Sequence, residues 1–246
     1  MSEWKARRFW KTASLTETGA GFGVALDARP LRTPAGARLI VPTRAMAAAI
    51  AAEWQAQDSE VKPASMPVTR AANAAIDKVS AQFDEVAGMI AAYADSDLLC
   101  YRAGSPQELV ARQAAAWDPL LDWAAQRFGA RLMTVSGVMH RPQDARALGR
   151  LADQVHAMGP FELTAFHDLV GLSGSLVLGL AAIHEVAPIG EIWRLSRIDE
   201  TWQEEQWGID EEARTLAGRK ESEFRAAKRF HDLARDRGQV APDDEE

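Results

Sequence analysis

Apolar and polar positions alternate in the first part of the chain. In residues 22–27, Phe, Val and Leu alternate with Gly, Ala and Asp, a period of two that is typical of a strand with one buried face. The Gly-Ala-Gly turn at 19–21 separates this strand from one expected over 8–15. A second turn at 27–30 ends in proline, and a short strand is expected at 39–41. Together these segments predict an antiparallel meander.

The period changes to that of a helix after Thr43, a good N-cap residue. Met46, Ile50 and Trp54 recur every four residues, so they share one stripe that we expect to pack on the sheet. Trp54 is therefore predicted to be a structural core residue. We expect Trp54→Arg to abolish folding, because losing the ring costs about 3–5 kcal/mol and burying a charge adds more. Thermal melting checks this, and a normal melting transition would contradict it.

Most of the remaining chain has helical spacing. The predicted fold class is α+β: a small N-terminal antiparallel sheet with a helix, followed by a larger helical bundle. The expected domains are 1–80 and 81–240, with an acidic tail at 241–246. The expected helical segments are a short helix over 73–79, an apolar stripe over 83–93, a helix starting at 118–119, a stripe over 148–155, one buried helix over 169–183, an acidic helix from 191 to Gly208, and a final helix through 216–227.

Composition excludes several classes of protein. The 246 residues are 47% hydrophobic and 26% charged, which is normal for a globular chain. The single cysteine, Cys100, rules out an internal disulfide or a multi-cysteine metal site, and its apolar neighbours should keep the thiol protonated. A net charge of −7 argues against nucleic acid as a partner. The longest apolar run, 169–183, is shorter than a membrane span, so we expect a cytoplasmic bacterial monomer without membrane insertion.

Motifs for cofactors and metals fail on their context. The glycines at 19–23 precede a strand, whereas a phosphate loop needs a helix N-terminus. Residues 171–175 miss the nucleophile elbow at their last position. His184 lacks the second histidine that a zinc helix requires. We therefore expect neither a cofactor nor a metal.

Two weaker candidates for catalysis remain. His167 and Asp168 resemble a base with its orienting acid, but neighbours on a helix are expected to point apart. Asp95 and Asp97 resemble an acid pair, although a helix cap with Arg102 as salt partner explains them more simply. The alternative function kept open here is a small-molecule hydrolase or transferase, with Asp97 or His167 at a site between the two domains.

Charge is distributed unevenly along the chain. Residues 1–44 hold eight basic and three acidic side chains, a net of +5, whereas 191–212 hold eight acidic and two basic ones, a net of −6. The acidic segment also contains Trp193, Trp202 and Trp207. On one continuous helix, 193 and 202 lie on opposite sides, so at least one tryptophan should be exposed. Aromatic anchors ringed by charge are typical of a protein–protein contact.

Seven segments, in this order, resemble the ATP synthase F1-ATPase assembly chaperone family that binds the alpha subunit (the mitochondrial F1 complex assembly factor 2 family and its bacterial relatives). The similarity runs from about Arg8 to Phe230. Ala28 stands where the family usually has glycine. The segments are 26–34, 41–43, 53–54, 66–70, 97–102, 117–120 and 196–208.

The resemblance implies a non-enzymatic chaperone of mixed fold without a nucleotide site. It implies transient binding of the unassembled alpha subunit and shielding of its beta-facing surface until beta replaces the chaperone. The resemblance and the residue pattern meet in the acidic, tryptophan-bearing segment. The candidate partner-binding residues are Glu191, Trp193, Arg197, Asp199, Glu200, Trp202, Glu204, Glu205, Trp207 and Asp210.

Overall fold

The alternating residues near the start of the chain form a small antiparallel sheet in the computed structural model, which describes residues 7–236. Strands β1 (Ala13–Thr18) and β2 (Gly21–Leu26) pair along their whole length. They are joined by the predicted turn at 19–20. The short strands β3 (Arg29–Pro30) and β4 (Ile40–Val41) both pair antiparallel with β2. The sheet, with the helices described below, confirms the predicted α+β class.

β1 begins at Ala13, later than the strand predicted over 8–15. Before it, the Asp27 carboxylate accepts the N–H groups of Thr12 and Lys11 at 2.9 and 3.0 Å. These bonds lower the pKa of Asp27. A side chain thus provides the hydrogen bonds that a strand partner would otherwise provide, and the regular strand starts after them.

The first helix follows the prediction closely. α1 (Arg44–Gln55) starts where the Thr43 hydroxyl oxygen accepts the Met46 N–H at 3.1 Å. Met46 and Ile50 are fully buried. Trp54 is half-buried, and its ring meets that of Trp10 with centroids 5.1 Å apart. Trp54 therefore lies at the margin of the core, and the effect of Trp54→Arg stays a prediction.

The second helix starts earlier than predicted. α2 (Pro67–Ala74) continues into the π-helical turn η2 (Ala75–Val79), whereas only a short helix near 73–79 was expected. Proline is well suited to the first helical position. The Glu53 carboxylate of α1 caps the new helix, because it accepts the N–H groups of Val68 and Thr69 at 2.8 Å each. This cap comes from 15 residues away, so the local pattern did not reveal it.

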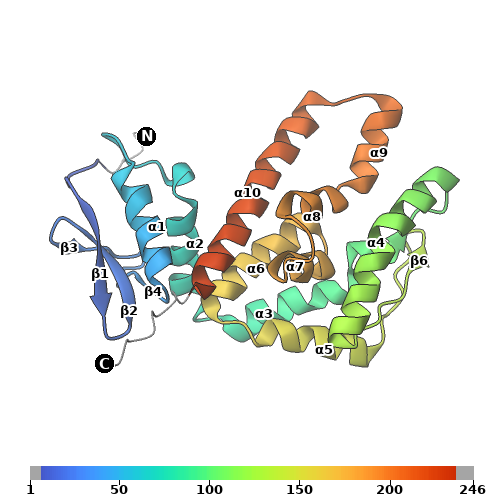
Figure 1. The fold of residues 1–246 in the computed structure, drawn as a ribbon, viewed down its shortest axis with the longest axis horizontal. Helices are drawn as coiled ribbons and strands as arrows, with labels where there is room; N and C mark the ends of the chain where they lie inside the picture. Colours follow the sequence, from blue (N-terminus) through green and yellow to red (C-terminus); the bar gives the residue numbers. More distant parts are fainter. Residues whose placement is uncertain (1–6, 237–246) are drawn as a thin grey trace, which may run out of the picture. The chain divides into compact units, whose positions relative to one another are not determined.

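The remaining elements are helical apart from one two-stranded parallel pair (Figure 1). Short 3₁₀ turns are η1 (Pro63–Ser65), η3 (Ala92–Ser96) and η4 (Leu98–Cys100). The other elements are α3 (Phe83–Ala91), β5 (Tyr101–Arg102), α4 (Gln107–Phe128), β6 (Val135–Ser136), α5 (Ala145–His156), α6 (Pro160–Ser173), α7 (Leu176–Ile183), α8 (Ile189–Leu195), α9 (Ile198–Trp207) and α10 (Glu211–Arg235).

The chain divides into two units. Among the described residues, the first comprises 7–82, 160–164 and 229–236, and the second comprises 83–159 and 165–228. The sequence pattern placed a boundary at 80–81 but did not predict that two later pieces join the first unit. The expected acidic tail at 241–246 lies outside the described residues. The core of the second unit includes α7, in which every residue from 176 to 182 is buried.

Two predicted helix boundaries are corrected by the structure. α4 runs through Pro119 without ending, because Trp117 and Leu120 on either side of the proline are buried and this packing outweighs the roughly 3 kcal/mol cost of an interior proline. The single helix predicted over 169–183 is two helices. Gly174 ends α6 with a φ of 71°, and the Ser175 hydroxyl caps α7.

The acidic helix predicted from 191 is also interrupted. α8 ends at Ser196, whose hydroxyl donates to the Trp193 carbonyl at 2.7 Å. α9 then starts after Arg197 and ends at Gly208, as predicted, with a φ of 90°. The break separates the three tryptophans into two helices, so each faces a different environment.

Candidate partner-binding surface

α9 is fixed to α4 by a charged and aromatic contact. The Arg112 guanidinium donates two hydrogen bonds to the Glu205 carboxylate, at 2.9 and 2.8 Å, and lies 4.9 Å from the centre of the Trp202 ring. The hydrogen bonds between Arg112 and Glu205 raise the pKa of Arg112 and lower the pKa of Glu205. Gln113 of α4 donates to Asp199 at 2.6 Å. These contacts hold α9 in a defined orientation.

Buried aromatic contacts and hydrogen bonds stabilise the junction between α8 and α9. Trp193 is only 4% exposed, and its ring packs against Phe224 of α10 with centroids 5.5 Å apart. Arg197 lies over the Trp193 ring at 5.8 Å and bonds Glu200 at 2.6 Å. The Trp117 indole donates to the carbonyl of Leu195 at 2.8 Å. Trp193 therefore supports this surface from the core rather than forming part of it.

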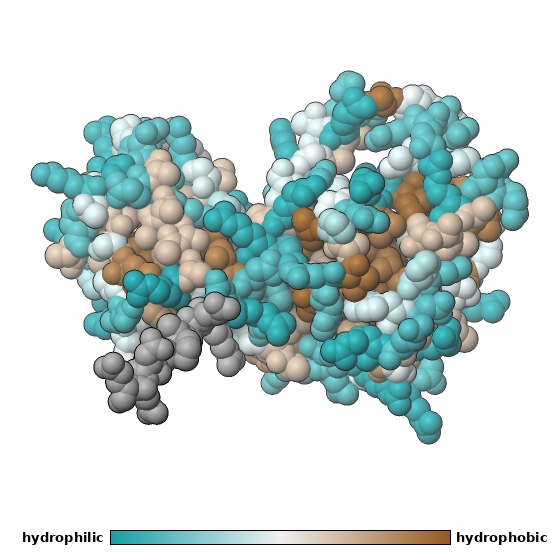
Figure 2. Space-filling view, viewed as in Figure 1, coloured by the Kyte–Doolittle hydropathy of each residue, from teal (hydrophilic) through white to brown (hydrophobic). Residues whose placement is uncertain are grey.

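The connection between α9 and α10 presents apolar side chains to solvent. We call residues 207–216 the α9–α10 tip. Trp207 is 80% exposed, Ile209 50% and Leu216 52%. Figure 2 shows a small hydrophobic spot over this connection, surrounded by hydrophilic residues. Trp207 fulfils the prediction that at least one tryptophan of the segment is exposed.

The tip also contains the cap of the next helix. The Asp210 carboxylate accepts the N–H groups of Glu212 and Ala213 at 2.9 and 3.2 Å, so it caps the start of α10. Glu211 and Glu212 in the first turn are exposed. The tip thus presents exposed aromatic and aliphatic side chains beside exposed acidic ones, and such side chains can anchor a protein partner.

Apart from Trp193 and Glu191, the predicted partner-binding residues separate into three groups. Arg197, Asp199, Glu200 and Glu205 hold α9 through bonds within the chain. Trp202 and Glu204 are half-buried on α9. The exposed tip brings together Trp207 and Asp210 with residues that the sequence reasoning did not single out, Ile209 and Leu216.

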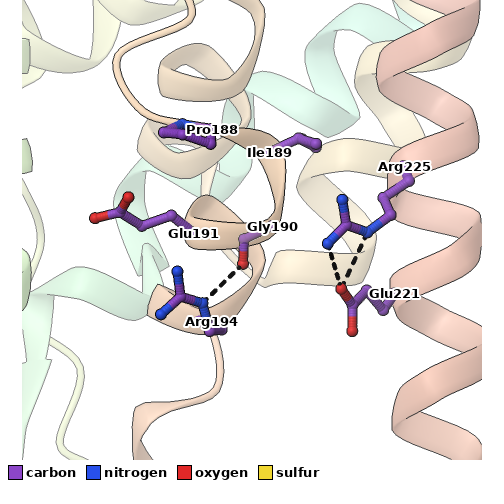
Figure 3. A pocket seen from close by; sticks show the side chains of 7 residues that line it. All are labelled: Pro188, Ile189, Gly190, Glu191, Arg194, Glu221 and Arg225. Atoms are coloured by element: carbon purple, nitrogen blue, oxygen red, sulfur yellow. Dashed lines mark hydrogen bonds and ion pairs between the residues drawn. The ribbon is translucent and has the colours of Figure 1, made fainter.

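Glu191 lies apart from the tip, at an open hollow of about 470 Å³ between α8 and α10. Figure 3 shows Glu221 and Arg225 on α10, bonded to each other at 2.7 Å, facing Gly190 and Arg194 of α8. Two acidic and two basic side chains line the hollow, so it carries little net charge. The lining residues are Pro188, Ile189, Gly190, Glu191, Arg194, Glu221 and Arg225.

Sequence reasoning missed the residues that position α9, namely Arg112 and Gln113. Their partners lie 93 and 86 residues further along the chain, and no local period links such positions. Ile209 carried a usable signal, because it is an apolar residue beside the acidic run 210–212, whereas Leu216 follows that run and carried no such signal.

Asp97 is a buried structural group. It is fully buried, and its carboxylate accepts the N–H groups of Leu99 and Val177 at 3.0 Å each. Burial raises its pKa, against the effect of these bonds. Arg102, expected as a salt partner of this acid pair, instead bonds Asp118 at 2.7 Å. The predicted cap is therefore present, with a different partner for the arginine.

The other candidates for chemistry also have structural surroundings. His167 does contact Asp168, at 3.0 Å, although they were expected to point apart; the bond raises the pKa of His167, and both side chains are exposed. The buried Cys100 thiol has its pKa raised to about 12 by burial, as its apolar neighbours predicted. Within residues 7–236, no three His, Cys, Asp or Glu side chains are grouped to hold a metal.

The same described residues contain no helix that is both long and apolar enough to cross a membrane.

Comparison with known proteins gives consistent matches. Residues 7–125 match the family described as ATP12 chaperone protein. Protein atp12, mitochondrial, from Schizosaccharomyces pombe is 23% identical over 222 residues, which cover 85% of this chain and 76% of that protein. Atp12 from Paracoccus denitrificans, whose crystal structure is known, has 49% sequence identity to this chain. Its structure matches with a TM-score of 0.92 over 95% of this chain and 100% of the other. A candidate chaperone from Agrobacterium tumefaciens is 41% identical, with a TM-score of 0.89 and coverage of 93% and 86%.

Proposed function

This chain belongs to the ATP12 chaperone family, and we propose that it assists assembly of the F1 sector of ATP synthase by binding the unassembled alpha subunit. In this proposal it covers the surface of alpha that later meets the beta subunit, and beta then replaces it. The role is non-enzymatic, and the proposed place of action is the bacterial cytoplasm.

The observation that carries the proposal is the α9–α10 tip. A subunit that waits for its partner exposes an apolar interface, which is an aggregation hazard. A chaperone that covers such an interface needs apolar anchors of its own, and Trp207, Ile209 and Leu216 supply them in exposed positions. The bonds that join α9 to α4 and the Asp210 cap of α10 fix the two helix ends that carry these side chains, which reduces the ordering cost of binding.

The acidic side chains of the tip favour a particular kind of client surface. Asp210, Glu211 and Glu212 lie within the tip, next to its apolar side chains, so a client patch with basic residues around an apolar centre is electrostatically complementary. Charged rims contribute more to association rate and selectivity than to affinity. A moderate, partly polar interface suits a partner that must later be displaced.

Copurification tests the proposal. The tagged full chain is mixed with purified alpha subunit, with and without beta, and the same experiment with beta alone is the control. We expect capture of alpha, release of alpha as beta is added, and no capture of beta alone. Failure to capture alpha, or capture that beta does not reverse, would overturn the proposal.

A further inference from the structure

The first unit has a sheet edge that is suited to receive another strand. β1 pairs with β2 on one side, and within the described residues no strand pairs with its other side. Exposed edges are templates for strand addition, and proteins usually protect them with proline, lysine, a bulge or a covering segment. β1 contains neither proline nor lysine, and its register with β2 is regular over all six residues.

The register shows which backbone groups face outward. Bonded and non-bonded residues alternate along an antiparallel pair. The Asp27 N–H donates to the Thr12 carbonyl at 2.8 Å, so the backbone groups of Thr12 point toward β2. The backbone N–H and carbonyl groups of Ser14 and Thr16, which follow in steps of two, therefore also point toward β2. Leu15 and Glu17 therefore direct their N–H and carbonyl groups away from the sheet.

Ala13 supports this assignment. It belongs to the outward-facing set, and its N–H donates to the Gln55 side chain at 2.8 Å rather than to β2. Gln55 covers the start of the edge, where it also donates to the Lys11 carbonyl at 3.2 Å. Beyond this point the outward groups of Leu15 and Glu17 have no hydrogen-bond partner among residues 7–236. The open part of the edge is thus residues 15–18.

Charge indicates what can occupy the edge. Residues 7–44 carry seven Lys or Arg against two Asp or Glu, a net of +5. The side chains of Glu17 and Arg44, which bond each other beside this edge, are 63% and 70% exposed. Along the edge itself, Arg8 donates to the Lys11 carbonyl at 3.2 Å near the start, and Glu17 bonds Arg44 near the end. Three basic side chains and one acidic side chain thus lie along the β1 edge, so an acidic segment would be attracted.

We propose that β1 binds an extended, acidic segment of the client as an added strand, through the outward N–H and carbonyl groups of Leu15 and Glu17. This inference rests on the proposed function, because the segment belongs to the alpha subunit. Main-chain hydrogen bonds supply affinity in such strand addition, and side chains supply selectivity. The edge is separate in sequence and opposite in charge to the α9–α10 tip, so the client would be recognised by two surfaces of different chemistry.

Amide hydrogen exchange on the full chain, with purified alpha subunit as the probe, tests this inference. We expect the Leu15 and Glu17 amides to exchange rapidly in the free chain and at least about tenfold more slowly in the complex. A complex that forms without this protection overturns the inference and leaves the proposed function standing. Failure to form any complex overturns both.

A matched pair of variants at one position gives a second readout. Glu17→Pro removes the outward N–H, whereas Glu17→Ala removes the ion pair with Arg44 but keeps that N–H. We expect Glu17→Pro to weaken alpha binding about tenfold and Glu17→Ala less than about twofold. Equal effects of the two variants would contradict strand addition.

Two controls complete the experiment. Ser14→Pro, whose N–H faces β2, should lower the melting temperature while Glu17→Pro leaves it nearly unchanged, which checks the register. If Glu17→Pro nevertheless fails to fold, the exchange data on the unmodified chain decide. Sedimentation of the chain alone reveals self-association, and a dimer broken by Glu17→Pro would identify a second copy as the occupant and overturn the inference.

Discussion

Acidic side chains perform opposite tasks in two regions of the second unit. At the turn η4, Asp97 is fully buried, and backbone N–H groups of η4 and α7 surround its carboxylate. At the α9–α10 tip, acidic side chains face solvent around Trp207 and Ile209. The Asp97 carboxylate is buried and fully hydrogen-bonded, so it stabilises the fold. The acidic side chains of the tip are exposed next to apolar ones, so they are available to a partner.

Closely spaced acidic residues do not by themselves identify a binding site. Both regions contain closely spaced carboxylates in the sequence, and only the structure separates an acid that serves the fold from those available to a client. Changes at η4 should therefore affect the free energy of unfolding, and changes at the tip should affect binding of alpha.

Asp97→Ala should have the largest effect on stability. It leaves the buried N–H groups of Leu99 and Val177 without their acceptor, which should lower the free energy of unfolding by about 2–5 kcal/mol. Urea denaturation measures this loss. Asp97→Asn keeps one acceptor oxygen and should lose less, so equal losses for the two variants would contradict the assigned role.

Cys100 should make stability fall at alkaline pH. Its folded pKa is raised from 9.0 to about 12, so between these values the unfolded chain releases the thiol proton while the folded chain keeps it. Stability should therefore decrease as pH rises through this window, by at most about 1.4 kcal/mol per pH unit from this group. Urea denaturation between pH 9 and 11 measures the slope, and Cys100→Ala should flatten it. An unchanged slope in the variant would contradict the burial of the thiol.

The Arg112–Glu205 pair should have a small effect on stability and a larger one on binding. The pair is partly exposed, so Glu205→Lys should lower the free energy of unfolding by no more than about 1 kcal/mol. We expect it to weaken alpha binding, because the lysine repels Arg112 and releases the end of α9. The reversed pair, Arg112→Glu with Glu205→Arg, tests the reason. Recovery of binding indicates that the pair positions α9, whereas no recovery indicates that Glu205 contacts the client directly.

How far the sequence predicted the fold depended on whether a signal was local. The Thr43 cap and the turn at Gly19 were predicted because their partners lie within a few residues. Pro119 was misread because the packing of α4 against distant segments outweighs the local preference of proline. The break at Gly174 and Ser175 carried a local signal, a glycine followed by a good cap residue, which the uniform apolar run concealed.

The candidate site was predicted in a similar, partial way. The density of tryptophan and acidic residues between 191 and 212 pointed to the segment that contains the exposed Trp207, and the role of this segment in binding stays a prediction. It did not reveal that Trp193 is buried while Trp207 is exposed, because that difference depends on the break after α8. It also did not reveal Arg112 and Gln113, since contacts across about ninety residues leave no period in the sequence.

The most direct test of the central claim is the affinity of the alpha subunit for a tip variant, Trp207→Ala with Ile209→Ala. The matched control is Val138→Ala with Met139→Ala, which removes apolar side chains that are 91% and 78% exposed elsewhere in the same unit. We expect the tip variant to bind alpha at least about thirtyfold more weakly. The control should bind normally, and both variants should stay within about 0.5 kcal/mol of the unmodified chain in stability. Unchanged affinity of the tip variant, or equal losses in both variants, would contradict the claim that the α9–α10 tip binds the client.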